Sequence, residues 1–244
     1  MRIYIGFDDT DTALSDRGTG KLSRWFENKL PTGTRQWGVI RQQLPVLEGI
    51  PFTSHNSSAC VVVEADDPSF ADTLTTLAAE HIQEYFLEGS DPGLCVVAEN
   101  NHPMNGLINF GKECCFRIVT QKEAMEAARD VHLSGHGGTN DGIIGAAAAV
   151  GLTMYGWSGR FIEFGRLRDF ADSVTVGELE EKGIQVVSID RNAIVPGPAD
   201  LLKTNGWLRP RLWGGKPILA VQAFQEEPFK WEVVGKKGKK AHMQ

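Results

Sequence analysis

The sequence predicts an α/β (α+β) protein with a mixed sheet in a larger first domain and a smaller α+β domain after it. Short apolar runs alternate with longer segments of helical periodicity up to about residue 160, which is typical of this class. The remainder has shorter predicted elements and a concentration of tryptophan. At 244 residues the chain is long enough for two compact domains, each with its own core.

Runs of apolar and β-branched residues predict the strands of the first domain. The first run, residues 2–7, is apolar almost throughout, so we expect a strand buried in the sheet. Runs of the same kind predict further strands at 36–44, 59–65, 94–98 and 115–120.

Apolar residues at helical spacing predict the helices between these strands. In segment 21–30, Leu22, Trp25 and Phe26 share one face, and Pro31 ends the helix. The other helices of this domain are predicted at 70–87, 121–133 and 143–154.

We place the first domain at residues 1–160 and the second at residues 161–235. In the second domain a helix and two strands are predicted, at 174–182, 184–189 and 216–224. Residues 236–244 are basic and predict a disordered tail.

The charge balance limits the partners of the chain. It has 25 Lys and Arg against 31 Asp and Glu, a formal charge of −6. This argues against a protein that coats DNA or RNA, which needs a broad basic surface, but leaves local contact with RNA open.

Cysteine use and hydropathy predict a cytoplasmic protein with no membrane partner. The four cysteines are too few for a disulfide scaffold, so we expect reduced thiols. Acidic residues appear by position 8, so no secretory signal is expected. The longest apolar stretch, at 142–156, has about 15 residues, whereas a helix that spans a bilayer needs about 20.

Three carboxylates follow the first predicted strand. Asp8, Asp9 and Asp11 come directly after Phe7, at the end of a strand where sheets of this class place their ligands. Crowded carboxylates repel one another unless a cation or hydrogen-bond donors neutralise them. Mg²⁺ suits this position because it often combines one or two carboxylates with substrate phosphates. The alternative is a turn in which one Asp caps the next helix.

The same loop continues with a glycine-containing segment that indicates phosphate binding. Gly18 and Gly20 allow backbone amides to approach a ligand closely, and Thr19 lies between them. Lys21 adds a positive charge there. The segment is not a Walker A loop, because Leu22 stands where that motif has Ser or Thr. A flexible turn remains the alternative.

A second glycine-rich segment precedes the helix predicted at 143–154. Gly138 and Gly142 free the backbone to turn, while Asn140 and Asp141 can cap the helix. Amides at such a helix start can hold phosphate. Alternatively, the segment only caps a core helix whose small residues pack closely. Beside an acidic loop for Mg²⁺, the two segments together predict a site for Mg²⁺ and ATP.

The histidines give weaker signals. His132 and His136 have the spacing of a metal-binding pair, but the glycines around His136 argue against a continuous helix there. His55 lies in a polar loop before a strand, where a surface position is favoured over a role in a site.

Four motifs, in this order, resemble the catalytic part of the archaeal tRNA-isoleucine agmatinylcytidine synthetase family. They are IGFDDTDT at 5–12, IPFTSHNSSACVVVEADD at 50–67, SDPGLCVV at 90–97 and GGTNDGIIGAAAAVGL at 137–152. Each motif is loose, but four in order are specific. The resemblance covers about residues 1–155.

This resemblance implies an atypical kinase-like catalytic domain that holds Mg-ATP. The family uses ATP to phosphorylate the wobble cytidine of a tRNA and then installs agmatine. By resemblance, Asp8, Asp9 and Asp11 would take the metal and the phosphates, and Gly142 to Ala146 would line the nucleotide site. The second domain would correspond to the ferredoxin-like domain of the family.

The chain departs from the family pattern in two ways. The family continues after its acidic loop with Arg-Gly-x-Cys-Thr-Thr, in which one threonine is implicated as a phosphoacceptor. Here Lys21 and Leu22 replace the threonine pair, and Thr19 is the residue that can substitute. We also expect a stand-alone homologue without the oligonucleotide-binding barrel and zinc ribbon of the family, since the sequence contains no Cys-x-x-Cys.

The sequence thus predicts a phosphotransferase or ligase that depends on Mg²⁺ and ATP and acts on an acceptor that is a small molecule or a tRNA. Asp8, Asp9 and Asp11 would hold the metal across the phosphates. Lys21 would neutralise charge that develops during transfer.

Two other functions stay open. The segment FDDTDTAL is similar to the nucleophile motif of haloacid-dehalogenase-like phosphatases, with Asp9 as nucleophile and Asp11 as acid or base. The second alternative is that the chain is a non-catalytic nucleotide- or RNA-binding module. Its aromatic and basic residues near the end suit that function: Trp207, Arg209, Arg211 and Trp213.

Overall fold

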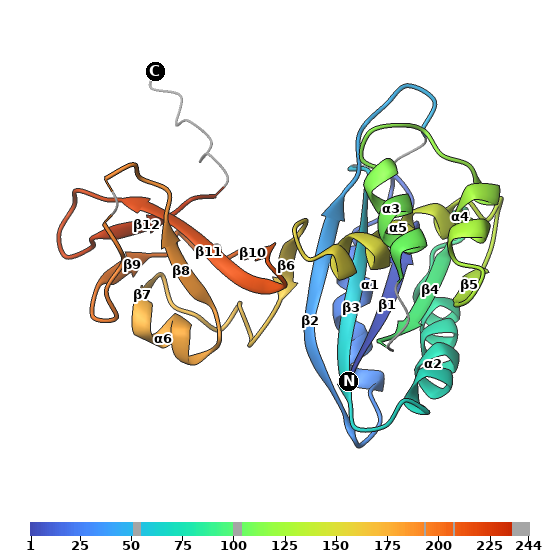
Figure 1. Cartoon of the computed structure of the whole chain (residues 1–244), viewed down its shortest axis with the longest axis horizontal. Coiled ribbons are helices and arrows are strands. Elements are labelled where there is room, and N and C mark those ends of the chain that lie inside the picture. Colours follow the sequence, from blue (N-terminus) through green and yellow to red (C-terminus); the bar gives the residue numbers. More distant parts are fainter. Residues whose placement is uncertain (51–54, 100–103, 193, 207, 236–244) are drawn as a thin grey trace. The chain divides into compact units, whose positions relative to one another are not determined.

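The computed structural model describes residues 1–50, 55–99, 104–192, 194–206 and 208–235, so the predicted tail at 236–244 and Trp207 lie outside the described residues. The chain divides into two compact units, Met1–Phe164 and Gly165–Gln244 (Figure 1). The division falls after residue 160 because strand β6 (Arg160–Glu163) pairs with a strand of the first unit.

A sheet lies at the centre of the first unit, with the strand order β5–β4–β1–β3–β2–β6 (Figure 1). Its strands besides β6 are β1 (Arg2–Asp8), β2 (Thr34–Gln43), β3 (Ser57–Ala65), β4 (Gly93–Ala98) and β5 (His132–Gly135). Each described pair in this unit is antiparallel. Gly6 of β1 pairs with Cys60 on one side and with Cys95 on the other, so β1 is an inner strand.

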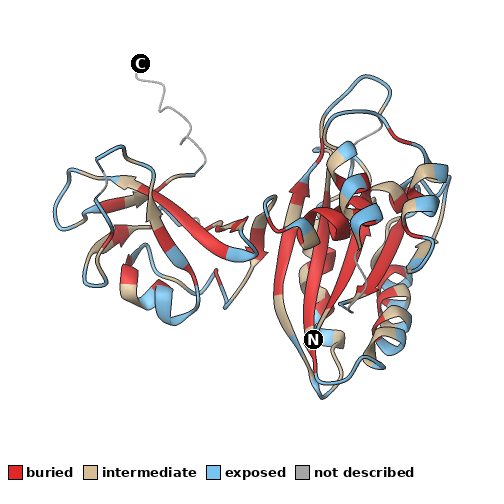
Figure 2. Cartoon of the chain, in the orientation of Figure 1, coloured by how far each residue is buried: buried red, intermediate tan, exposed pale blue. Residues whose placement is uncertain are grey.

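Helices cover both faces of this sheet (Figure 1). On one face lie α1 (Thr19–Trp25), the 3-10 helix η1 (Phe26–Lys29) and α2 (Phe70–Tyr85), and on the other lie α3 (Asn105–Glu113), α4 (Gln121–Ala127) and α5 (Gly142–Tyr155). The strands are buried between the two layers, as Figure 2 shows. Ile3, Ile5 and Phe7 are fully buried, which explains the apolar sequence of β1.

Helix α5 is buried along most of its length because its residues are small and apolar all round. Its four consecutive alanines, Ala146 to Ala149, are fully buried. Small side chains let the helix lie close to the sheet, and the end of β1 therefore lies beside the start of α5.

The second unit is a smaller mixed structure. Its elements are β7 (Ser173–Thr175), α6 (Val176–Glu181), β8 (Gln185–Ser188), β9 (Leu201–Lys203), β10 (Arg211–Trp213), β11 (Lys216–Ala223) and β12 (Trp231–Val233). Strand β11 pairs antiparallel with β10 and β12 and parallel with β8, while β9 pairs parallel with β12. The predicted α+β class is confirmed, and the ferredoxin-like assignment stays a prediction.

Three predicted elements differ from the structure. The strand predicted at 115–120 is wrong: the segment is a turn and loop, in which Phe116 and Ile118 are 83% and 52% exposed and only Val119 is buried among its large apolar residues. The helix predicted at 121–133 ends at Ala127, and the chain then enters β5, which pairs with β4. The helix predicted at 174–182 starts two residues late, because Thr175 belongs to β7 and caps α6.

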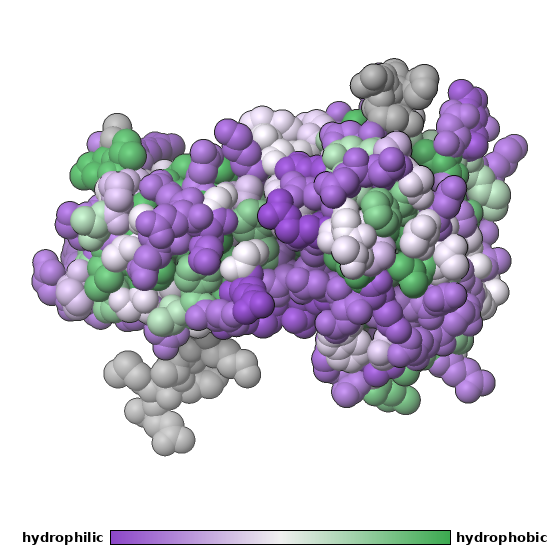
Figure 3. Space-filling view, turned by 90° about the horizontal axis from the view of Figure 1, so that it is seen from below, coloured by the Kyte–Doolittle hydropathy of each residue, from purple (hydrophilic) through white to green (hydrophobic). Residues whose placement is uncertain are grey.

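The surface carries no continuous apolar belt on the face that Figure 3 shows, where hydrophobic residues are scattered among hydrophilic ones in both units. In the described part of the chain no helix has the length and apolar character needed to cross a membrane. The four cysteines are free, as expected.

Candidate functional site

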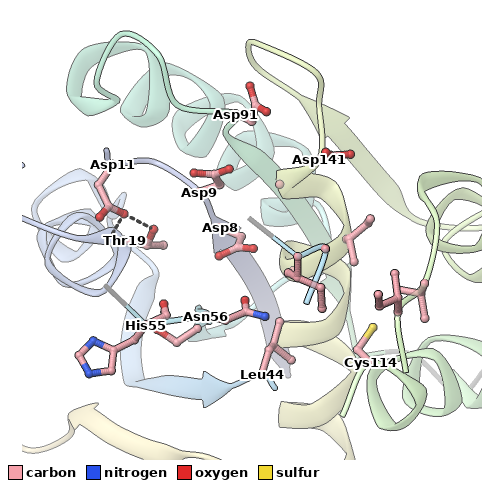
Figure 4. Close-up of a pocket in the computed structure, with 18 of the residues that line it drawn as sticks. Asp8, Asp9, Asp11, Thr19, Leu44, His55, Asn56, Asp91, Cys114 and Asp141 are labelled. Atoms are coloured by element: carbon pink, nitrogen blue, oxygen red, sulfur yellow. Dashed lines mark hydrogen bonds between the residues drawn. The ribbon is translucent and has the colours of Figure 1, made fainter. Parts of the chain in front are cut away.

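A cavity of about 440 Å³ opens where β1 ends, beside the starts of α1 and α5 (Figure 4). One part of its wall is acidic and another is mixed polar and apolar. The acidic part is made by Asp8, Asp9, Asp11, Asp91 and Asp141. The mixed part includes Leu44, His55, Asn56, Ser57, Cys114, Arg117, Ile118 and Val119.

The structure brings together about half of the residues that the sequence singled out. Asp8, Asp9, Asp11, Thr19, Asp141 and Gly142 line the cavity. The remaining predicted residues lie nearby without lining it: Gly18, Gly20, Lys21, Gly138 and Asn140. His55, which we expected on the surface, also lines the cavity.

Asp8 is the last residue of β1 and lies against the backbone of α5. A Cβ atom added at Gly145 would stand 1.7 Å from Asp8 Oδ2, so only glycine leaves room for this carboxylate. Burial raises the pKa of Asp8 to about 8, and the neighbouring Asp9 acts in the same direction. Burial therefore favours the protonated form of this carboxyl.

Asp9 follows in a left-handed backbone conformation, with φ of 49°. This turn aims its side chain into the cavity beside Asp8 (Figure 4). Burial raises the pKa of Asp9 to about 6, and the negative charges of Asp91 and Asp11 act in the same direction. Two adjacent carboxyls with raised pKa values are typical of a site that takes a cation or moves protons.

Asp11 turns toward α1 and binds its first residue. The Thr19 hydroxyl and backbone amide both donate to Asp11 Oδ1, at 3.3 Å each. The Thr19 hydroxyl also accepts hydrogen bonds from the hydroxyl and the backbone amide of Thr10, at 3.1 and 3.3 Å. Asp11 thus caps the start of α1 and holds a nearly buried hydroxyl at the cavity wall (Figure 4).

The rest of the first glycine segment has packing roles in the structure. The Lys21 ammonium lies over the Trp25 ring, 5.2 Å from its centroid. A Cβ at Gly20 would meet Ile162 at 3.0 Å, so this glycine lets α1 approach the sheet. Gly18 is the N-cap of α1 and lies next to Asp11.

Asp91 holds the second glycine-rich turn. Its carboxylate accepts hydrogen bonds from the Thr139 amide at 2.9 Å and the Thr139 hydroxyl at 2.6 Å. Two observations require glycine at position 138: its φ of +57° lies in the left-handed region, and a Cβ atom there would overlap the Asp91 carboxylate. The Gln121 amide donates to Asp141 at 2.6 Å and fixes the turn from its other side.

Asn140 and Gly142 complete this turn. Asn140 has φ of 66° and packs its carboxamide against Gly135. The Gly142 amide donates to the backbone oxygen of Asp91 at 3.1 Å. Because the Gly142 amide already donates within the protein, the structure favours helix capping over phosphate binding at this residue.

Asp91 is the acid of the cavity wall that the sequence analysis did not single out. It stands in the quoted motif SDPGLCVV, but a single acid before Pro and Gly has the appearance of an ordinary turn. Gly145 falls within the range Gly142 to Ala146 that the resemblance assigns to the nucleotide site, but its contact with Asp8 was not predicted. Both residues make their contacts with partners far away in sequence, which spacing alone does not show.

In the described chain, no group of three His, Cys, Asp or Glu side chains is arranged to hold a metal ion. The spacing of His132 and His136 does not reflect a metal pair: both rings bind the Ser134 hydroxyl, at 2.8 and 2.9 Å, along β5. The candidate metal ligands that lie side by side are the carboxyls of Asp8 and Asp9, on one cavity wall (Figure 4).

The aromatic and basic residues near the end form no exposed stacking surface among the residues that the structure describes. Trp213 is only partly exposed, and the Arg211 guanidinium lies 5.1 Å from the centroid of its ring. Arg209 donates to the backbone oxygen of Leu208 at 2.8 Å. Trp207 lies outside the described residues.

No protein-family model matches the sequence, and no curated protein matches it. Solved structures do match. A tRNA fluorescent labeling enzyme and a complex of TiaS with its tRNA and ATP each have a TM-score of 0.52 and 25% identity, over 62% of this chain and 36% of theirs. Apo TiaS, a tRNA agmatidine synthetase, matches with a TM-score of 0.50 and 25% identity, over 62% of this chain and 35% of its own.

The resemblance to the agmatidine synthetase is confirmed. It is a likeness in both fold and sequence, and it agrees with the family that the four motifs indicated. The chain spans little more than a third of the length of the TiaS structures.

Proposed function

We propose that the chain is an ATP-dependent transferase or ligase that modifies RNA of the tRNA class, with Mg-ATP held in the cavity of the first unit. One observation carries the proposal most directly. Two adjacent carboxyls with raised pKa values share a cavity with a carboxylate-bound hydroxyl, in a fold similar to that of TiaS, which has been solved with tRNA and ATP.

The donor set of the site suits a magnesium ion that brings further ligands with it. Asp8 and Asp9 do not form a complete protein cage, but Mg²⁺ usually keeps waters and combines one or two carboxylates with substrate phosphates. A divalent cation beside the pair would remove the repulsion that contributes to both raised pKa values. The residues therefore fit Mg²⁺ that enters with a nucleotide, and bound there the ion would offset the negative charge of the phosphates.

The residues around the pair orient the reactants. Asp11 holds the Thr19 hydroxyl by accepting its hydrogen bond, so the hydroxyl oxygen keeps a fixed position at the wall. The turn fixed by Asp91 places the start of α5 at the same cavity, and its helix dipole favours an anion there. Leu44, Ile118 and Val119 form apolar parts of the wall.

The test follows label from ATP into RNA. The protein is incubated with Mg²⁺, total tRNA and ATP labelled in either the α- or the γ-phosphate. Phosphotransfer moves the γ-label to RNA and releases ADP, whereas a ligase step through an adenylylated acceptor releases pyrophosphate and then AMP. We expect either product only when tRNA is present, since an acceptor is needed to complete turnover.

Asp9→Asn is the variant that tests the site, because it removes the charge and keeps the shape. We expect it to lose turnover and at least tenfold of the affinity for a magnesium complex of a non-hydrolysable ATP analogue, measured by calorimetry. Asp72→Asn on the exposed side of α2 is the matched control. Equal affinity in Asp9→Asn and the parent protein would contradict the proposal. Hydrolysis of a simple phosphate monoester without ATP would favour a phosphatase instead.

A further inference from the structure

We propose that Arg41 of β2, together with Arg160 opposite it on β6, forms a binding site for a phosphate group beside the acidic cavity. The proposed function uses only the acidic wall and the two glycine-rich turns, so this site adds a second, basic part. The phosphate belongs either to the nucleotide or to the RNA acceptor.

Arg41 is a half-buried cation without an acidic partner. Its Nε atom donates to the Ser57 hydroxyl at 2.9 Å. No carboxylate of the described residues forms an ion pair with it. Burial lowers the pKa of its guanidinium, and no neighbouring acid counteracts that effect. Buried cations in proteins are normally paired, so this one has a binding capacity that the fold itself does not use.

The sheet places a second guanidinium group next to the first. Arg41 and Arg160 are register partners on neighbouring antiparallel strands, so their side chains leave the same face of the sheet. That face is the one under α1 and α2, because Val39 and Ile162, two residues away on the same strands, belong to the core there.

The position connects the pair to the site. Arg41 lies in one row with Ala59 and Phe7, because β2 pairs with β3 and β3 pairs with β1. Two strand spacings separate Arg41 from Phe7, about 10 Å between Cα atoms. The next residue, Asp8, points to the other face of the sheet, toward α5, so the link to the cavity runs through Ser57. Ser57 accepts a hydrogen bond from Arg41 and itself lines the cavity. A phosphate bound beside Ser57, from a nucleotide or from an RNA strand at the cavity edge, therefore comes within reach of Arg41.

Guanidinium is the group best suited to phosphate, because its planar fork of N–H donors matches two phosphate oxygens at once. The acidic wall and the basic pair then have separate tasks. The acids face the cation and the transferred group, while the arginines hold a phosphate that does not react.

The anion site is tested by thermal unfolding in phosphate against chloride at equal ionic strength. We expect phosphate to raise the Tm of the wild-type protein by about 2–4 °C, because a ligand of the folded state stabilises it. Arg41→Gln should remove most of this increase. The matched control is Arg35→Gln on the same strand, a 79% exposed side chain, which should keep the increase. The same increase in Arg41→Gln, or none in the wild type, overturns the proposal.

Folding of the variant is checked separately. If Arg41→Gln does not fold, Arg41→Lys serves in its place, since it keeps the charge but loses the planar fork. We then expect about half of the phosphate-dependent increase in Tm, and an unchanged increase overturns the proposal in the same way.

A second measurement identifies the source of the phosphate. Affinities for ADP and for a labelled twelve-nucleotide RNA are measured between about 50 and 200 mM KCl. If RNA supplies the phosphate, Arg41→Gln weakens RNA binding about three- to tenfold and lowers the salt slope by about 1, with ADP binding unchanged. If the nucleotide supplies it, only ADP binding weakens. A protein that binds neither ligand but keeps the Arg41-dependent response to phosphate would disprove the proposed function and leave the anion site standing.

Discussion

At the scale of single residues, the position of Asp8 depends on the absence of a side chain at Gly145. The carboxylate occupies the space that a Cβ atom would fill, at 1.7 Å from Oδ2. It is also deprived of water there, which is the main reason that its pKa rises to about 8. The absence of a side chain at Gly145 thus makes room for the Asp8 carboxyl between β1 and α5.

Gly145→Ala tests this dependence. The new methyl group must displace Asp8 or push α5 away from β1, and overpacking of this kind costs about 1–3 kcal/mol of unfolding free energy. We expect a loss of at least tenfold in nucleotide affinity, measured by calorimetry alongside urea denaturation. Gly106→Ala in α3 is the control, because the nearest atom to its new methyl lies 3.6 Å away and alanine favours the helix. Normal nucleotide binding in Gly145→Ala would argue against a role for Asp8.

The sequence shows the acids of the site but not the contacts between them. Asp8, Asp9 and Asp11 stand out because three carboxylates follow one apolar strand. Asp91 and Gly145 do not, because each acquires its role through a partner that the fold brings near. Long-range partners of this kind depend on the register of strands and the rotation of helices, which local patterns do not fix.

At the scale of elements, the Asp91 carboxylate holds one side of the turn before α5. Asp91 accepts two hydrogen bonds from Thr139 and fills the space beside Gly138. Asp91→Ala removes both bonds and loosens the turn on this side, while Gln121 still holds it from the other. We expect at least fivefold weaker nucleotide binding with a loss in Tm of only a few degrees, because the turn lies at the surface and few core contacts depend on it. Thr139→Ser, which keeps both donors, should bind the nucleotide normally. Unaltered binding in Asp91→Ala would mean that the turn does not contribute to the site.

Helices α1 and α2 are joined by a buried histidine. His81 is fully buried, and its Nε2 atom lies 2.9 Å from the carbonyl oxygen of Leu22, so Nε2 carries the proton. Its Nδ1 atom has no partner among the described residues. Burial lowers the pKa of this imidazole, since a second proton would have no acceptor.

This histidine predicts a pH dependence of stability. Below about pH 6.5 the unfolded chain takes up a proton at His81 that the folded chain does not, so His81 lowers stability as the pH falls, whereas Asp8 and Asp9, whose pKa values are raised in the folded chain, act in the opposite direction. Urea denaturation of the wild type and of His81→Gln, which keeps one donor for Leu22, between pH 7 and pH 5 isolates the contribution of His81. We expect the wild type to lose stability relative to the variant as the pH falls, and an equal pH dependence in the two proteins would contradict this role.

The elements that the sequence predicted well are those with long, regular patterns. The apolar run of β1 and the helical spacing in α2 and α5 are strong local signals. Helix α3 (Asn105–Glu113) was missed, because two glycines interrupt it and its apolar positions are few. The loop at 115–120 was predicted as a strand because β-forming residues say nothing about whether a partner strand is present.

At the scale of the whole molecule, all residues assigned to the nucleotide site lie in the unit Met1–Phe164. A fragment of residues 1–164 keeps every strand of the antiparallel sheet, including β6. We expect it to fold and to bind Mg-ATP within about threefold of the affinity of the full chain, as measured by calorimetry. A fragment that ends at residue 157 lacks β6 and should be less stable, because β2 then has an unpaired edge. Loss of binding in the folded 1–164 fragment would show that residues after 164 contribute to the site.

The inner position of β1 determines which parts of the cavity can move. Because β1 has hydrogen-bonded neighbours on both sides and helices over both faces, its amide protons should exchange with solvent only when the entire unit opens. Asp8 is the last residue of this slowest-exchanging segment. The wall made by the segments at 44–50 and 114–119 belongs to loops and turns, whose amides should exchange much sooner. An entering substrate therefore meets one fixed carboxyl, that of Asp8, with loops around it that can adjust, so adaptation to different acceptors falls to the loops.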